Sequence, residues 1–182
     1  MKWVTRTFVH LDRVASPWLI KRFIDPEAIF VFVPWGDEDA RPHDAIPFAL
    51  PGAEIGPHDK DGTSFAKFLA KYQLHEPALI SIEKVIAAGV DHALHGYRPA
   101  PDETYGQIAV GLLAMSEGMM LIHEDDTTII DRSLPIYDAL RTYFTAHHLA
   151  AASGLPMPER AGKGPTNETV FLRKLLKSRA SG

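Results

Sequence analysis

The chain has 182 residues, of which 46% are hydrophobic and 23% charged, a composition typical of a globular protein and not of a disordered or fibrous one. It contains no cysteine, which excludes a disulfide framework, an iron–sulfur cluster, a thiolate-bound zinc and a cysteine nucleophile. Any metal ion would have to be held by the nine histidines and by carboxylates, which suits zinc, manganese, iron or nickel. The net charge of −4 argues against a polyanion-binding protein.

The sequence shows neither a membrane span nor a targeting signal. No run of 18 apolar residues occurs, and Arg6, Asp12 and Arg13 stand where a signal peptide needs an unbroken apolar stretch. We therefore expect a cytoplasmic protein without membrane contact. The oligomeric state stays open, with a homo-oligomer as one alternative.

The first third of the chain is predicted to contain two strands joined by a short helix. β-Branched and aromatic residues indicate a strand over Trp3–Val9. Ser16 and Pro17 have the pattern of an N-cap followed by proline at the first helical position, which predicts a helix over Pro17–Ile24. The apolar run Ala28–Val33 predicts a buried central strand beside the first. A parallel crossover and a hairpin-like return are both compatible with this connection.

The rest of the chain is predicted to be mainly helical. Ile46–Leu50 reads as a third strand at a sheet edge, because Pro47 cannot donate a ladder hydrogen bond. Gln107–Ile122 is apolar on nearly all sides, which predicts the most buried helix of the protein. Further helices are expected to start at Thr63, Pro77 and Asp126, the second of them ending at Gly89. We therefore predict an α+β fold with a small three-stranded sheet packed on a mainly helical domain.

The composition divides the chain into three parts. Residues 1–150 are predicted to form the domain, and residues 151–167, rich in proline and glycine, a linker. Residues 168–182 are expected to form an amphipathic basic helix, since residues 158–182 contain six Lys or Arg and only two Glu. Such a basic end is typical of a solvated terminal helix, so nucleic acid is not the expected partner.

Three polar clusters could carry chemistry: His10, Asp12 and Arg13; Glu54 and His58; and Asp91, His92 and His95. On an extended segment alternate residues face the same side, so His10 and Asp12 would project together. His92 and His95 would share a face if their segment is helical. Each cluster also has an ordinary structural interpretation, namely helix capping, a solvated loop and a charge at a helix end.

The segment His10–Pro34, HLDRVASPWLIKRFIDPEAIFVFVP, resembles the opening of the C-terminal domain of the bacterial chromate-resistance protein B family. There the pattern is His-x-Asp-Arg, then a small residue or Cys before Pro-Trp-Leu-Ile, then Arg-Arg-Phe-Ile-Asp. Residues 45–72, 111–120 and 134–144 are similar to later blocks of the same family, in the same order. The resemblance covers residues 3 to about 145, with Ser16 where many members have Cys.

The resemblance implies a role in chromate resistance, a stress response in which the longer family proteins regulate an export system. Our first hypothesis is a module that binds or senses a metal or an oxyanion. The second is a metal-dependent enzyme of unassigned reaction, in which Glu54 or Asp12 acts as a general base beside a metal-bound water. The third is a DNA-contacting accessory protein that uses Arg173, Lys174, Lys177 and Arg179.

We predict that one pocket brings together His10, Asp12, Glu54 and His58, with Asp91 and Arg13 touching the ligand or lying directly behind these residues. Ligands far apart in sequence can meet only through the fold. The ligand would be a small inorganic ion or oxyanion. A divalent transition metal would be held by His10, Asp12, Glu54, His58 and Asp91. Alternatively, a tetrahedral oxyanion would be bound by Arg13 and Arg22, whose guanidinium groups offer a forked pattern of donors, together with His10 and His58.

Overall fold

The computed structural model describes residues 1–162 and 164–180 and shows an α+β fold, as predicted. The strands are β1 (Lys2–Arg6), β2 (Ile29–Val33) and β3 (Ile46–Pro47). The α-helices are α1 (Asp12–Leu19), α2 (Ser64–Lys71), α3 (Pro77–His95), α4 (Thr104–Ile122), α5 (Asp126–Ser153) and α6 (Thr166–Ala180). A π-helical turn over Ile20–Ile24 follows α1, and a 3-10 turn over Glu38–Ala40 follows β2.

The three strands form one parallel sheet in the order β2-β1-β3. β1 runs parallel to β2, with Lys2 opposite Ile29, so α1 and the π-helical turn form a β-α-β crossover. This settles the connection that the sequence left open. The prediction that Ala28–Val33 is the central strand is wrong: β1 is central, and Ile29 on the edge strand β2 is 63% exposed. The third strand lies at the other edge, as Pro47 predicted.

The first helix begins at Asp12, not at Pro17 as predicted. Ser16 is therefore inside the helix, where its hydroxyl group donates to the Asp12 carboxylate over 3.4 Å instead of capping the first turn. Pro17 removes one helical hydrogen bond. The start of α1 is held by tertiary contacts, since the Leu11 amide donates to Ser116 Oγ over 2.8 Å. Sequence-local capping rules could not anticipate that contact.

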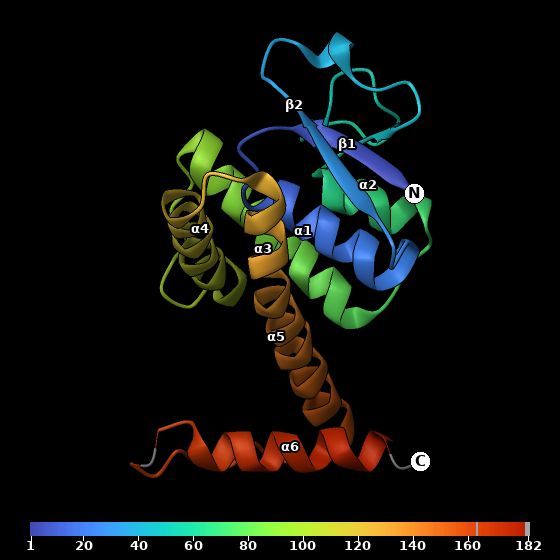
Figure 1. Ribbon diagram of the computed structural model, residues 1–182. Helices are drawn as coiled ribbons and strands as arrows, with labels where there is room; N and C mark the ends of the chain where they lie inside the picture. Colours follow the sequence, from blue (N-terminus) through green and yellow to red (C-terminus); the bar gives the residue numbers. More distant parts are fainter. Residues whose placement is uncertain (163, 181–182) are drawn as a thin grey trace.

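The sheet lies at one end of the molecule, and α6 lies across the far end of the long helix α5 (Figure 1). The largest fully buried side chains are aromatic: Trp3, Trp18, Phe48, Phe65, Phe68 and Tyr137. Trp18 of α1 stacks on Phe65 of α2 and on Tyr137 of α5, with ring centroids 6.4 and 5.8 Å away. This stack of aromatic rings joins α1 to α2 and to α5.

The prediction that Gln107–Ile122 is the most buried helix is wrong. Eight residues of α3 are buried but only five of α4, although both helices have 19 residues. Met115, Leu121 and Ile122 of α4 are exposed. Of the helices in the described part, only α4 is long and apolar enough to cross a membrane, and 22% of that stretch is buried. Part of the apolar surface of α4 is thus exposed to solvent.

The ends of the other helices follow the predictions in part. Thr63 caps α2, as predicted, by accepting a hydrogen bond from the Ala66 amide over 3.0 Å, and Pro77 is the first residue of α3. α3 does not end at Gly89, however, but continues to His95. A Cβ atom at Gly89 would lie 2.8 Å from Leu11 Cδ2, so this glycine lets the helix approach the β1–α1 loop closely.

Helices α5 and α6 both extend into the predicted linker, which is therefore shorter than expected. α5 continues to residue 153 and α6 begins at residue 166, which leaves residues 154–165 between them. The expected C-terminal helix is thus present within α6. Residue 163 of the predicted linker and residues 181–182 of the predicted basic helix lie outside the described residues. The division into domain, linker and terminal helix stays a prediction.

Candidate ligand-binding site

A pocket of about 240 Å³ lies between the β1–α1 loop, the loop before α2 and the C-terminal part of α3. Its polar lining consists of Arg6, His10, Asp12, Arg13, His58 and Ser64, and the ring of Trp35 also contributes. The fold thus brings together residues from two of the three clusters that the sequence singled out.

The β1–α1 loop has a backbone that requires support. Phe8 and Leu11 adopt positive φ angles of 59° and 44°, which non-glycine residues rarely do. The Asp126 carboxylate accepts hydrogen bonds from the amides of Phe8 (3.1 Å) and Val9 (2.8 Å). Asp126 was predicted to cap α5, but Asp125 is the cap, so Asp126 is free to hold this loop.

Two further side chains from the helices hold Leu11. Its amide donates to Ser116 Oγ of α4, and its carbonyl accepts from the Tyr137 hydroxyl of α5 over 3.1 Å. Burial raises the pKa of Tyr137, and the nearby Asp12 carboxylate adds to that shift. The hydroxyl therefore stays protonated and remains a donor. The β1–α1 loop, which forms one wall of the pocket, is thus fixed by α4 and α5.

Arg13 lies under the same loop and binds its carbonyl groups. Its guanidinium group donates to Thr7 O over 3.0 Å, to Phe8 O over 3.1 Å and to Arg6 O over 3.4 Å. Burial, and secondly the neighbouring charge of Arg6, lowers the pKa of Arg13 to about 10. Arg13 therefore still carries its charge at neutral pH.

The indole ring of Trp35 joins the two arginines. The guanidinium carbons of Arg6 and Arg13 lie 4.0 and 5.1 Å from the ring centre. Arg6 forms an ion pair with Glu38, with Nε 3.2 Å from a carboxylate oxygen, but its buried Nε–H forms no hydrogen bond with the described residues. Two cationic groups thus meet at the pocket, and one of them has a donor without a hydrogen bond.

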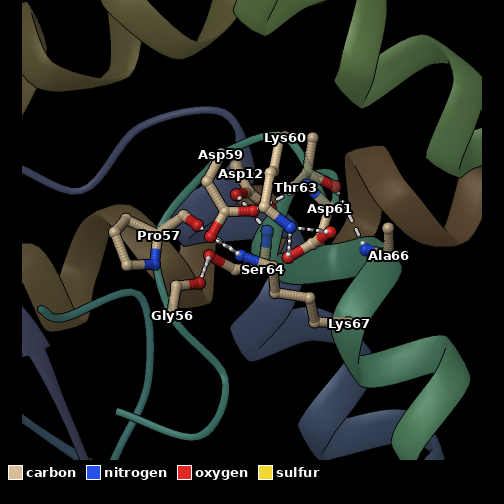
Figure 2. Close-up of polar contacts among 10 residues, drawn as sticks. All are labelled: Asp12, Gly56, Pro57, Asp59, Lys60, Asp61, Thr63, Ser64, Ala66 and Lys67. Atoms are coloured by element: carbon tan, nitrogen blue, oxygen red, sulfur yellow. Dashed lines mark hydrogen bonds and ion pairs between the residues drawn. The ribbon is translucent and has the colours of Figure 1, made fainter. Parts of the chain in front are cut away.

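Asp12 connects the pocket to the start of α2 (Figure 2). Its two carboxylate oxygens accept hydrogen bonds from the amides of Ser64 (2.9 Å) and Phe65 (3.0 Å). Burial raises the pKa of Asp12, and these backbone hydrogen bonds oppose the shift. The carboxylate thus satisfies amides that would otherwise be orphaned at a helix start. A metal ion would have to compete with those amides for both oxygens.

The loop that carries His58 is fastened to α2 at two points (Figure 2). Ser64 Oγ donates to Gly56 O over 2.9 Å, and Lys67 Nζ donates to Pro57 O over 2.6 Å. His58 lines the pocket directly after these anchors. Its Nδ1 atom is buried and has no hydrogen-bond partner in the described part of the chain. The histidine thus presents an unused nitrogen.

The third cluster reaches the site because α3 continues past its predicted end. Asp91 and His95 lie one helical turn apart, and their ligand atoms and one of His58 lie within 4.8 Å of one another. His92 points elsewhere, with its Nδ1 3.3 Å from Arg98. His95 was not among the predicted ligands, although its spacing of four residues from Asp91 was the signal that could have found it.

Two predicted site residues lie apart from both the pocket lining and the cluster of His58, Asp91 and His95. Glu54 is 75% exposed in its side chain and forms an ion pair with Lys71 over 2.5 Å. Arg22 forms two hydrogen bonds with Asp138 of α5, over 2.9 and 2.7 Å. Conversely, Trp35 was missed, because a tryptophan in a polar loop carries no sequence pattern that points to a distant site.

Comparisons with known proteins identify the family of the chain. The sequence model of the ChrB C-terminal domain matches residues 3–144. The chain belongs to this family. Protein ChrB of Cupriavidus metallidurans (strain CH34) is 34% identical over 149 residues, which cover 80% of this chain and 41% of that protein. This chain thus spans less than half the length of that relative. No solved structure matches the chain. The resemblance to the chromate-resistance protein B family is confirmed.

Proposed function

We propose that this domain binds a small tetrahedral oxyanion of the chromate class and so supplies the ligand-sensing part of a ChrB-type chromate-resistance protein. The observation that carries the proposal is the meeting of Arg6 and Arg13 on the ring of Trp35 at one wall of the pocket. Membership of the ChrB family supports chromate as the first anion to test.

The electrostatics of the pocket favour an anion. Arg13 is buried, and the charge of Arg6 adds to the burial that lowers its pKa. Glu38 pairs with Arg6, and Asp126 and Asp12 partly offset the effect of burial on Arg13. Like charges close together away from water cost free energy, and an anion in the pocket would add to this compensation. Groups held in such an unfavourable arrangement are typical of binding sites.

The donors around the pocket suit the oxygens of a tetrahedral anion. Among the described residues Arg6 has a buried N–H without a hydrogen-bond acceptor, and His10 and His58 also line the pocket. Guanidinium groups bind oxyanions through charge-assisted hydrogen bonds, which are about twice as strong as neutral ones. A small cavity that is lined by cationic groups selects for size as well as charge.

The positions of the carboxylates favour binding over the enzyme hypothesis. Both oxygens of Asp12 accept amide hydrogen bonds, and Glu54 is paired with Lys71 outside the pocket lining. Neither is therefore placed as an unoccupied general base.

The proposal is tested by calorimetric titration of the purified chain with chromate and with sulfate, a tetrahedral anion of the same charge. We expect Arg6→Gln to weaken binding at least about tenfold, the lower end for losing a hydrogen bond to a charged group. Arg22→Gln is the matched control, because Arg22 binds Asp138 and does not line the pocket. Equal affinities for the wild type and Arg6→Gln, or absence of binding to either anion, would refute the proposal.

A further inference from the structure

We infer that His58, Asp91 and His95 form a binding site for a divalent transition-metal ion at the α3 side of the pocket. This inference goes beyond the proposed function, since it rests on other residues except for His58. Neither Asp91 nor His95 lines the pocket that the arginines enter. The metal site is therefore distinct from the oxyanion pocket, with which it shares His58.

Three potential ligand atoms converge at this place. One nitrogen from each histidine and one oxygen from Asp91 lie within 4.8 Å of one another. The rings of His58 and His95 are 6.0 Å apart at their centres and inclined by 45°. Ligand atoms around a tetrahedral zinc ion are about 3.3 Å apart, as its bond lengths imply, so side-chain rotation can close the remaining gap.

Two of the three residues have polar atoms without a partner. His58 Nδ1 is buried and has no hydrogen-bond partner among the described residues, which is costly for a polar atom unless something binds it. Within residues 1–162 and 164–180, the Asp91 carboxylate forms no ion pair and accepts no hydrogen bond. A divalent cation would supply the partner that both groups lack.

All three residues are attached to regular elements, with the exposed His95 at the C-terminal end of α3. Asp91 and His95 occupy adjacent turns of α3, which Gly89 brings against the β1–α1 loop. His58 follows a stretch fixed to α2 through Ser64 and Lys67. A site on such elements requires little reorganisation when the ion binds.

The donor set indicates the class of ion. Two imidazoles and one carboxylate suit zinc and the neighbouring transition metals better than calcium or magnesium, which prefer oxygen ligands. Three protein ligands leave at least one coordination position for water or for another small ligand. His58 also lines the pocket of the proposed oxyanion, so this residue connects the two sites.

The test is a titration of the full chain with ZnCl2 by calorimetry, with oxyanions left out of the buffer, and with CoCl2 by visible absorption. We expect one ion per chain and cobalt d–d bands that indicate coordination by the protein. His95→Ala and Asp91→Asn should each weaken zinc binding at least about tenfold, in the range seen when a ligand set is damaged. Circular dichroism and thermal unfolding of each variant without metal show whether it is folded.

His92→Ala is the matched control, because it removes a histidine from the same turn of α3 that faces Arg98 instead of the cluster. It should retain wild-type zinc affinity. Equal zinc affinity of the wild type and His95→Ala, or an equal loss in His92→Ala, would overturn the inference. Arg6→Gln separates the two proposals: it should lose oxyanion affinity and keep zinc affinity. If zinc fails to bind while chromate still does, only the metal site is refuted.

Discussion

Two neighbouring helices of equal length, α3 and α4, differ in how much of their apolar surface is buried. α3 buries eight of its 19 residues, and α4 buries five although it is apolar on nearly all sides. α3 packs against α1, α2, α4 and α5, whereas the principal neighbours of α4 are α3 and α5. Burial therefore depends on how many neighbours the fold provides and not on the hydropathy of the helix alone.

The same comparison separates the two roles of the helices. α3 is held on several sides, and its last turns carry Asp91 and His95 to the candidate site. α4 contributes one polar contact to the site region, through Ser116, and leaves Met115 and Leu121 exposed. A helix packed on several sides can position side chains accurately because few alternative arrangements are open to it.

The largest expected effect comes from truncating a core residue of α3. Ile86 is completely buried, so Ile86→Ala should lower the free energy of unfolding by about 2–5 kcal/mol through lost burial and a residual cavity. Ile122→Ala on α4, where the side chain is 72% exposed, should change it by less than about 0.5 kcal/mol. Urea unfolding of both variants measures the difference. Similar losses would show that α4 is buried in solution, for instance against another chain.

An intermediate effect is expected from adding one methyl group to a glycine of each helix. At Gly89 the new Cβ would lie 2.8 Å from Leu11 Cδ2, so the buried leucine has to move. At Gly111 of α4 no atom lies within 4 Å, so alanine should stabilise the helix by up to about 1 kcal/mol. We expect Gly89→Ala to be less stable than Gly111→Ala by about 1–3 kcal/mol. Thermal unfolding followed by circular dichroism checks this order, and the reverse order would contradict the close packing of α3.

The smallest expected effect concerns pH. Burial raises the pKa of Glu83 on α3 above its ordinary 4.5, and the neighbouring Asp12 adds to the shift. The folded state then binds the proton more tightly than the unfolded state, so stability falls as pH rises from about 4.5 through the raised pKa. Glu83→Gln should reduce this decline, and the part that remains comes from Asp12, whose pKa is also raised. Glu117→Gln, on the exposed side of α4, should leave the decline unchanged. Urea unfolding between pH 4 and 8 measures the free energy of unfolding of each variant. A pH dependence of Glu83→Gln identical to that of the wild type would contradict this prediction.

Local patterns in the sequence correctly predicted several elements of the fold and two residues of the pocket. The edge position of β3 followed from Pro47, the start of α2 from Thr63 and that of α3 from Pro77. His10 and His58 were both singled out and both line the pocket. These features depend on backbone chemistry, or on clusters of residues within a few positions of one another, and such information is present in a short stretch of sequence.

The sequence by itself determined the family, the fold class and most of the helices and strands, because these depend on composition, periodicity and capping over short distances. Tertiary structure alone decided what each polar side chain binds. The carboxylates of Asp12 and Asp126 both accept hydrogen bonds from backbone amides of other segments, and the Glu54 carboxylate forms an ion pair with Lys71. Arg6 and Trp35 became part of the pocket because β1 ends there and the loop after β2 returns to it. A polar group takes whichever partner the packed chain places within hydrogen-bonding distance, and that distance is set by contacts between residues far apart in sequence.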